Sequence, residues 1–274
     1  MKKIIILLGI ILLVLLIYEY SSKDINEGVI SMVDNETSSN VTITIVYDNN
    51  EYDKNLKTAW GFSCLVELED KKILFDTGGD SLTLLSNMEK LKMDLKEIDI
   101  VVLSHIHGDH TGGLTGVLEK NPDVTVYIPK SFPNSFKDEI KSYGSSFIEV
   151  SNPNKIFNGV LSTGEIGTWI KEQSLIITTE KGLVVITGCA HPGIVDIVRK
   201  AKEITKENVH LVTGGFHLSA ASDTDLTQIV NTFRELDVKK VGPCHCSGDR
   251  CRELFEKEYG DDFVEVGVGR KIKI

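Results

Sequence analysis

Hydrophobic and polar residues alternate along the first part of the chain in the manner of β-strands. Residues 41–47 read Val-Thr-Ile-Thr-Ile-Val-Tyr, with the period of two that a half-buried strand requires. Two apolar runs, 64–68 and 72–75, are joined by Glu69-Asp70-Lys71, which predicts a hairpin. The run 99–103 is typical of a strand that is buried on both faces. Further short strands are predicted at 124–128 and 147–150.

The second half of the chain alternates strands with amphipathic helices. Apolar residues recur at helical spacing in 193–206 and 223–236, which predicts helices there, as the same spacing does for 81–92 in the first half. A short helix is predicted near 249–258. Strands are predicted at 175–179, 183–187, 209–213 and 239–242, and two more close the chain. This order predicts a mixed α/β fold. A four-layer αββα sandwich fits it, although periodicity alone does not select that fold over other layered folds.

The N-terminus differs from the rest of the chain. Lys2 and Lys3 precede an apolar run over 4–18 that only Gly9 interrupts. A helix of that length spans about 22 Å, short of the roughly 30 Å hydrocarbon core, and the length also suits the apolar part of a signal peptide. No A-x-A-like cleavage site follows, which favours an uncleaved anchor.

The domain prediction follows from this composition. Residues 1–20 are a membrane anchor or signal peptide, 21–40 a polar tether, and 41–274 the folded catalytic domain. The lysine pair predicts that the N-terminus stays inside, so the domain is membrane-anchored and extracytoplasmic, or secreted.

Charge and cysteine content narrow the class of protein. The net charge of -10 argues against a nucleic-acid partner, which requires a basic face. Five cysteines, an odd number, do not suggest a disulfide framework. Cys244 and Cys246 flank His245, and the alternatives for them are metal ligands, a redox pair or simply small buried thiols.

Four side chains that can bind a metal ion lie within six residues, in His105-Ile-His107-Gly-Asp109-His110. This segment directly follows the predicted strand 99–103. In extended backbone His105 and His107 point the same way, and Asp109 and His110 follow where the chain turns toward a helix. Imidazole and carboxylate together suit Zn²⁺, Mn²⁺ or Fe²⁺. The segment therefore predicts a metal site.

Three more histidines, His191, His217 and His245, each follow a predicted strand by a few residues. Because strand ends of this kind converge on one edge of a sheet, these histidines are candidates for the same site. His210 lies inside a strand and is interpreted as structural. Asp76 ends the strand 72–75, where it either caps a helix near residue 80 or orients a ligand.

These motifs resemble a known family. His105-x-His107-x-Asp109-His110 is similar to the signature of the metallo-β-lactamase superfamily, and Asp76 in Phe-Asp-Thr-Gly resembles its strand-end aspartate. The resemblance covers 41–274 and implies the αββα fold with a dinuclear metal centre. The motifs around His191, His217 and His245 look like the subfamily that includes an archaeal dihydropterin ribofuranosylaminobenzene-phosphate synthase, a transferase.

The resemblance also implies a set of ligands. His105, His107, Asp109, His110 and His245 match ligand positions of the superfamily, and Asp109 would also orient the nucleophile. The bridging aspartate of the superfamily is replaced by Cys189, so His191 becomes the candidate ligand there. The middle histidine ligand of the superfamily has no histidine counterpart in this sequence. Residues expected beside the metals or the substrate are Asp76, Glu165, Cys189 and His217.

Three functional hypotheses follow. The first is a hydrolase that uses a metal-activated hydroxide on a small ester, phosphate ester or lactone. The second is a transferase like the synthase, and the third is a non-catalytic metal-binding module. The expected cofactors are two divalent metal ions, zinc before manganese, iron or magnesium. The expected partners are a small-molecule substrate and, through the N-terminal segment, a membrane. Residues 129–160 are expected to form a variable wall of the pocket.

Overall fold

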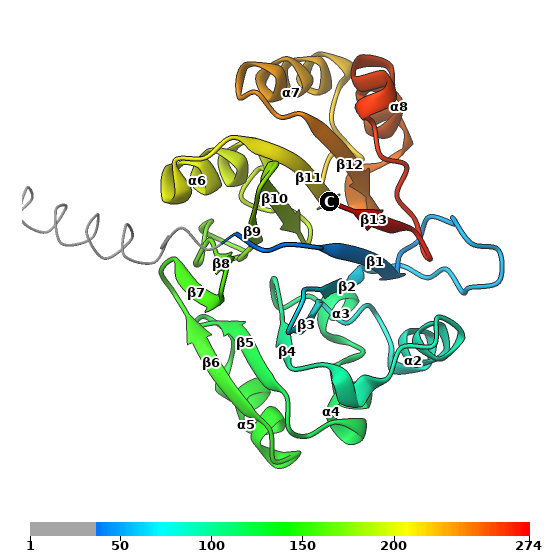
Figure 1. Ribbon diagram of the computed structural model, residues 1–274, viewed down its shortest axis with the longest axis vertical. Helices are drawn as coiled ribbons and strands as arrows, with labels where there is room; N and C mark the ends of the chain where they lie inside the picture. The colour runs from blue at the N-terminus through cyan, green and yellow to red at the C-terminus, as the bar shows by residue number, and fades with distance from the viewer. Residues whose placement is uncertain (1–36) are drawn as a thin grey trace, which may run out of the picture. The chain divides into compact units, whose positions relative to one another are not determined.

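Two β-sheets lie face to face in the computed structural model, which describes residues 37–274 (Figure 1). The first has seven strands in the order β13-β1-β2-β3-β4-β5-β6, and the second has six in the order β12-β11-β10-β9-β8-β7. The strands of the first sheet are β1 Thr42–Tyr47, β2 Ser63–Glu67, β3 Lys72–Phe75, β4 Ile100–Val102, β5 Thr125–Pro129, β6 Ser146–Val150 and β13 Lys271–Lys273. Those of the second are β7 Asn154–Phe157, β8 Val160–Ser162, β9 Leu175–Thr179, β10 Gly182–Thr187, β11 Val209–Gly215 and β12 Lys240–Cys244.

Helices cover the outer faces of both sheets (Figure 1). The helices beside the first sheet are α2 Ser81–Lys90, the short α3 Gly108–Thr111, α4 Leu114–Lys120 and α5 Asn134–Ser142. Those beside the second are α6 Ile194–Thr205, α7 Asp223–Glu235 and α8 Asp249–Tyr259. Three 3₁₀ turns complete the chain: η1 Leu95–Glu97, η2 His245–Ser247 and η3 Gly260–Asp262. The order helices, sheet, sheet, helices confirms the predicted four-layer sandwich.

Apolar side chains fill the space between the layers. One core cluster lies between the sheets and joins Ile45 and Val66 of the first to Val184 and Leu211 of the second, all at most 1% exposed. Another lies between the first sheet and its helices. Burial of one such side chain contributes about 1.5–3 kcal/mol. The apolar face predicted for the helix at 193–206 is the buried face of α6.

The direction of the strands brings the candidate residues together. Strands β3 to β6 run parallel, and so do β10 to β12. The loops that follow β3, β4, β10, β11 and β12 carry Asp76, the segment 105–110, His191, His217 and His245. Loops from both sheets therefore meet along one edge of the sandwich, as expected for a site at strand ends.

Some local predictions were wrong. Of the two predicted closing strands only β13 forms, and the chain near residues 263–268 makes isolated bridges instead. Residues 129–160 contain α5 and the edge strands β6 and β7, and their role as a variable wall of the pocket stays a prediction. The helix α5 was not predicted, because it follows Pro133 and buries only two of its nine residues.

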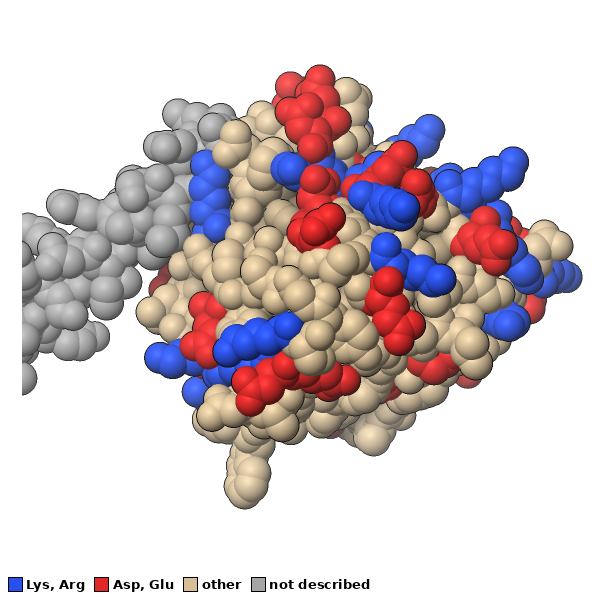
Figure 2. All heavy atoms as spheres, turned by 90° about the horizontal axis from the view of Figure 1, so that it is seen from below, with Lys and Arg blue, Asp and Glu red and all other residues tan. Residues whose placement is uncertain are grey.

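Other predictions concern residues outside the described part of the chain. The proposed anchor at 1–20 and most of the tether at 21–40 lie there. Over residues 37–274, none of the helices has the length and hydrophobicity that crossing a membrane requires. All five cysteines are free and buried. On the face seen in Figure 2, basic side chains are interspersed with acidic ones.

Candidate metal centre

Asp76 is a buried carboxylate that contacts Ser104 and His110, at the two ends of the loop after β4. It follows β3 in the left-handed region, at φ 56°, and is fully buried. One carboxylate oxygen accepts a hydrogen bond from the backbone N–H of Ser104 at 2.6 Å. The other accepts one from the Ser104 hydroxyl and lies 2.7 Å from His110 Nδ1. Helix α2 is capped by Asp80, so Asp76 does not have the capping role. It orients His110 instead.

Hydrogen bonds fix which nitrogen of three histidines carries a lone pair. The single proton of the Ser104 hydroxyl goes to Asp76, so that oxygen must accept from His105 Nδ1 at 2.9 Å. Asp76 accepts from His110 Nδ1 in the same way. Asn49 donates to the backbone oxygen of His245, and its Oδ1 lies 2.9 Å from His245 Nδ1. In all three imidazoles Nε2 is therefore the unprotonated nitrogen, whose lone pair is available to a metal ion.

The first group of ligand atoms comes from His105, His107 and His191, and these atoms lie within 4.8 Å of one another. His105 Nε2 is 3.1 Å from His107 Nδ1, and both rings lie 4.8 Å from the ring of His191. The buried Nε2 of His191 has no hydrogen-bond partner among residues 37–274. Three nitrogens that converge in this way can bind one cation.

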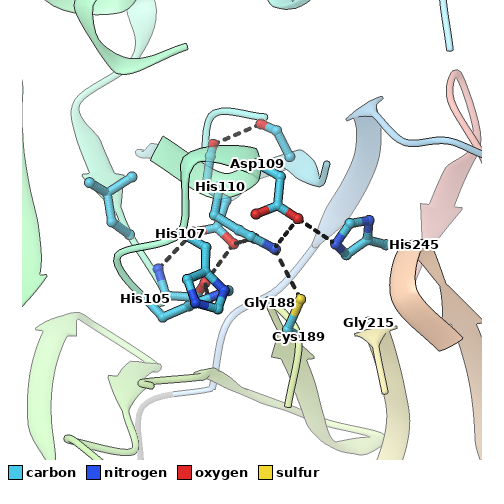
Figure 3. Close-up of polar contacts among 12 residues, drawn as sticks. His105, His107, Asp109, His110, Gly188, Cys189, Gly215 and His245 are labelled. Atoms are coloured by element: carbon cyan, nitrogen blue, oxygen red, sulfur yellow. Dashed lines mark hydrogen bonds and ion pairs between the residues drawn. The ribbon is translucent and has the colours of Figure 1, made fainter. Parts of the chain in front are cut away.

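The second group comes from Asp109, His110, Cys189 and His245 (Figure 3). His110 Nε2 lies 3.2 Å from Cys189 Sγ and 3.7 Å from Asp109 Oδ2. His245 Nε2 lies 3.4 Å from the same carboxylate oxygen, and it too is buried without a hydrogen bond within the described chain. Since a buried polar atom is costly unless it is partnered, these nitrogens fit divalent metal ions.

Burial and neighbouring charges shift the pKa values of several candidate ligands. Burial, followed by the neighbouring imidazoles, holds the pKa of His105 well below its usual value. Burial and His217 lower the pKa of His191 to about 4. Burial acts to raise the pKa of Asp109, but the nearby imidazoles of His245 and His110 outweigh it and lower that pKa. His105 and His191 are then neutral and Asp109 is ionised, as metal binding requires.

A buried carboxylate that the sequence did not reveal, Glu172, holds the loop after β10. It is 1% exposed and accepts hydrogen bonds from four successive backbone N–H groups, those of residues 188–191, at 2.9–3.1 Å. Burial raises its pKa to about 7, although the hydrogen bonds from Ala190 and His191 act to lower it. The loop that presents Cys189 and His191 is thereby fixed.

Glu165 corrects the sequence prediction, because it turns away from the ligands. Its carboxylate accepts a hydrogen bond from the backbone N–H of Ser131 at 2.7 Å and lies 3.5 Å from Lys171 Nζ. No group of convergent ligand atoms in residues 37–274 includes it. The prediction of Glu165 gave the right stretch of chain but the wrong carboxylate, since Glu172 lies seven residues later.

His217 lies at the edge of the centre. Its exposed ring is 4.4 Å from that of His191, and its ligand atom groups with those of Cys189 and Cys246. Cys244, by contrast, is fully buried beside Asp48 and takes no part. Trp60 also reaches the centre, with its ring 4.9 Å from His245 and 58% of its surface exposed. No sequence motif pointed to Trp60.

The fold and this histidine-rich centre define a class of metal-dependent enzymes. The chain belongs to the metallo-β-lactamase superfamily, whose family model matches residues 61–245. It is 31% identical to 7,8-dihydropterin-6-methyl-4-(β-D-ribofuranosyl)-aminobenzene-5′-phosphate synthase of Methanocaldococcus jannaschii, over 84% of this chain and 95% of that protein. This confirms the resemblance stated from the motifs.

Two further relatives extend the comparison. An uncharacterised protein of Methanocaldococcus jannaschii is 31% identical over 85% of this chain and all of its own length. Among solved structures, a metal-dependent hydrolase of the β-lactamase superfamily has a TM-score of 0.72 and 28% identity, over 85% of this chain and 99% of that one. The likeness therefore spans whole chains and not only the metal-binding motif.

Proposed function

We propose that the chain is a metal-dependent hydrolase that acts on a small ester, phosphate ester or lactone. The observation that carries this proposal is the pair of adjacent ligand groups, three nitrogens in one and a mixed oxygen, nitrogen and sulfur set in the other. Two divalent ions held there would lower the pKa of water and stabilise developing negative charge. Zinc suits both groups, with manganese, iron and magnesium as alternatives.

The residues of this chain have distinct tasks in that reaction. His105, His107 and His191 would hold one ion, and His110 and His245 the other. Asp109, ionised and half-buried, would ligate the second ion and orient the nucleophile through its remaining oxygen. Asp76 keeps His110 in the binding tautomer. Trp60 offers an apolar ring against which a substrate can lie, beside the metal-binding face of His245.

A second candidate function is a transferase of the synthase type. The specific observation in its favour is the 31% identity to the named synthase over nearly its whole length. The same metal centre would serve either reaction, because both displace a group from an activated substrate. The two candidates differ in the nucleophile, which is water in a hydrolase and the second substrate in a transferase.

One experiment separates the two candidates. The zinc- or manganese-loaded protein is assayed on chromogenic phosphodiester, phosphomonoester and lactone probes, and separately on a pterin-methyl diphosphate with and without an aminobenzene ribose phosphate. Turnover of a probe that Asp109→Asn reduces at least about 10²-fold supports the hydrolase. Diphosphate release that requires the second substrate supports the transferase. No turnover on any of them would overturn both candidates.

We also propose that residues 1–20 attach the protein to a membrane with the domain outside the cytoplasm. The support is the lysine pair followed by the apolar run 4–18. Fractionation of cells that express the full chain, followed by protease treatment of intact spheroplasts, tests this. Full-length protein recovered from the cytoplasm would contradict the proposal and would favour the transferase.

A further inference from the structure

We propose that Cys189, His217 and Cys246 form a third divalent-cation position beside the two-metal centre, one suited to a thiophilic ion such as Zn²⁺. The two sulfur atoms and one imidazole nitrogen lie within 4.8 Å of one another. Tetrahedral zinc with sulfur and nitrogen ligands places its ligand atoms about 3.5–3.8 Å apart. Side-chain shifts of about 1 Å or less therefore bring these three atoms onto one ion.

The three residues come from three adjacent loops of the second sheet. Cys189 follows β10, His217 follows β11 and Cys246 follows β12. The two cysteines are 3% and 4% exposed, whereas His217 is exposed. Such a position has two buried sulfur ligands and an open side toward solvent. The open side leaves room for a fourth ligand, water or a substrate atom, as in zinc sites that take part in chemistry.

Backbone strain is concentrated on the same three loops. Ala190, His217 and His245 have positive φ values of 58°, 54° and 47°. This conformation is unfavourable for a residue with a side chain, and it persists only where the surroundings enforce it. Ala190 adjoins Cys189 and His245 adjoins Cys246, so each loop is strained at or next to a proposed ligand. The loops are thus held in the conformation that makes the three ligand atoms converge.

The space around Cys246 is also kept open. A Cβ atom on Gly215 would lie 2.7 Å from Cys246 Sγ and 2.3 Å from the backbone oxygen of Gly188. A glycine at position 215 is therefore required for the sulfur to reach its place between β11 and the loop after β10. Cys251, on α8, lies outside the group and provides a matched control.

Cys189 links the proposed position to the two-metal centre. Its sulfur is 3.2 Å from His110 Nε2, and it belongs both to the group with Asp109 and to the group with Cys246. A thiolate can bridge two cations, so the third ion would share this sulfur with the second metal. Because thiolates favour zinc over manganese or magnesium, the third position would hold zinc even where harder ions fill the first position.

Metal counting tests the proposal without any assay of activity. Reduced, metal-free full-length protein is titrated anaerobically with Co²⁺, and thiolate-to-cobalt charge-transfer absorption is followed in the near ultraviolet. Zinc-loaded samples are desalted and their metal content is measured. We expect three equivalents in the wild type and in Cys251→Ala. We expect two equivalents in Cys246→Ser and in His217→Ala, with the charge-transfer intensity in Cys246→Ser reduced to about one third, because one of three thiolate–cobalt bonds remains.

Three results would overturn the proposal. The first is two equivalents of zinc in the fully reduced wild type. The second is an unchanged cobalt spectrum in Cys246→Ser. The third is a thiol titration in denaturant that finds three free thiols, which would mean that Cys189 and Cys246 are joined to each other. His217 is exposed, so His217→Ala keeps the metal count decisive even if the cysteine variant fails to fold. Failure of the hydrolase or transferase assays leaves these readouts unaffected.

Discussion

Three residues outside the candidate ligand groups determine which nitrogen atom of a neighbouring histidine is available to a metal ion. Asp76, Ser104 and Asn49 each accept a hydrogen bond from the Nδ1 atom of a histidine. Each bond fixes the tautomer and the ring orientation, and leaves Nε2 with its lone pair directed at the cluster. The chemistry of the centre therefore depends on oxygens next to the ligands as much as on the ligands themselves.

Replacement of Asp76 by asparagine tests this dependence. In Asp76→Asn the amide would offer a donor where His110 Nδ1 and the Ser104 hydroxyl both need an acceptor. We expect metal affinity to fall by about 10–100-fold, measured by competition with a chromophoric chelator. Asp94→Asn is the control, because Asp94 caps η1 away from the centre. Equal affinity in Asp76→Asn and wild type would contradict the orienting role.

The fluorescence of Trp60 can be used to measure metal binding at the centre. The chain has only two tryptophans, so Trp169→Phe leaves Trp60 as the single indole. Its ring is 4.9 Å from that of His245, and a cation bound at His245 changes the local field. We expect zinc to change the fluorescence of Trp169→Phe. The converse variant, Trp60→Phe, keeps only the 97% exposed Trp169 and should not respond. A response carried by Trp169 would be the contradictory result.

At the scale of elements, the two sheets meet through their strand-end loops. Gly188, after β10 of the second sheet, packs against Ser104, after β4 of the first. A Cβ atom at Gly188 would come within 2.1 Å of the Ser104 hydroxyl and 3.0 Å of Asp76. The close approach of the loops is what brings candidate ligands from both sheets into one group.

Gly188→Ala should separate these loops. We expect a loss of about 1–3 kcal/mol in the free energy of unfolding, measured with urea, because the contact is buried and cannot relax freely. The control is Gly108→Ala, since an added Cβ there meets nothing within 4 Å. Gly188→Ala should cost less stability in a Ser104→Gly background than in the wild type, because the clashing hydroxyl is then absent. An equal cost in both backgrounds would show that the clash with Ser104 is not the cause.

Glu172 joins the entry of β9 to the loop after β10. Glu172→Gln keeps the shape but replaces one oxygen by an amide group that cannot accept from His191. We expect a loss of about 1.5–3 kcal/mol in the free energy of unfolding, the value of a hydrogen bond to a charged group, together with weaker metal binding. Glu165→Gln is the matched control, since Glu165 also accepts from a backbone N–H. Equal losses in both variants would argue against a special role for Glu172.

At the scale of the whole molecule, features that follow from local sequence patterns could be predicted. Features that depend on contacts between distant residues could not. The αββα fold and the gathering of His105, His191 and His245 follow from strand patterns and from motifs at strand ends. Glu172 had no motif, because its role arises from contacts with residues 188–191 that exist only once β9 and β10 pair. The nearness of Cys246 to Cys189 likewise depends on β10, β11 and β12 lying side by side in the second sheet. Neither relationship is a local property of the sequence.

Metal removal tests whether the centre holds the two halves of the sandwich together. Ligands come from the loops of both sheets, and two buried Nε2 atoms have no hydrogen-bond partner within residues 37–274. An ion that binds only the folded state stabilises it by about 2.7 kcal/mol at a hundred times its Kd. For a domain of this size that raises Tm by about 5–10 °C. We expect a chelator to lower Tm by this amount and zinc to restore it. The triple variant His105→Ala, His110→Ala and Cys246→Ser, which disrupts all three groups of ligand atoms, should melt at one temperature with or without zinc. If zinc raised the Tm of that variant as much as the wild type, the stabilising ions would bind elsewhere, and the centre would not be the link between the sheets.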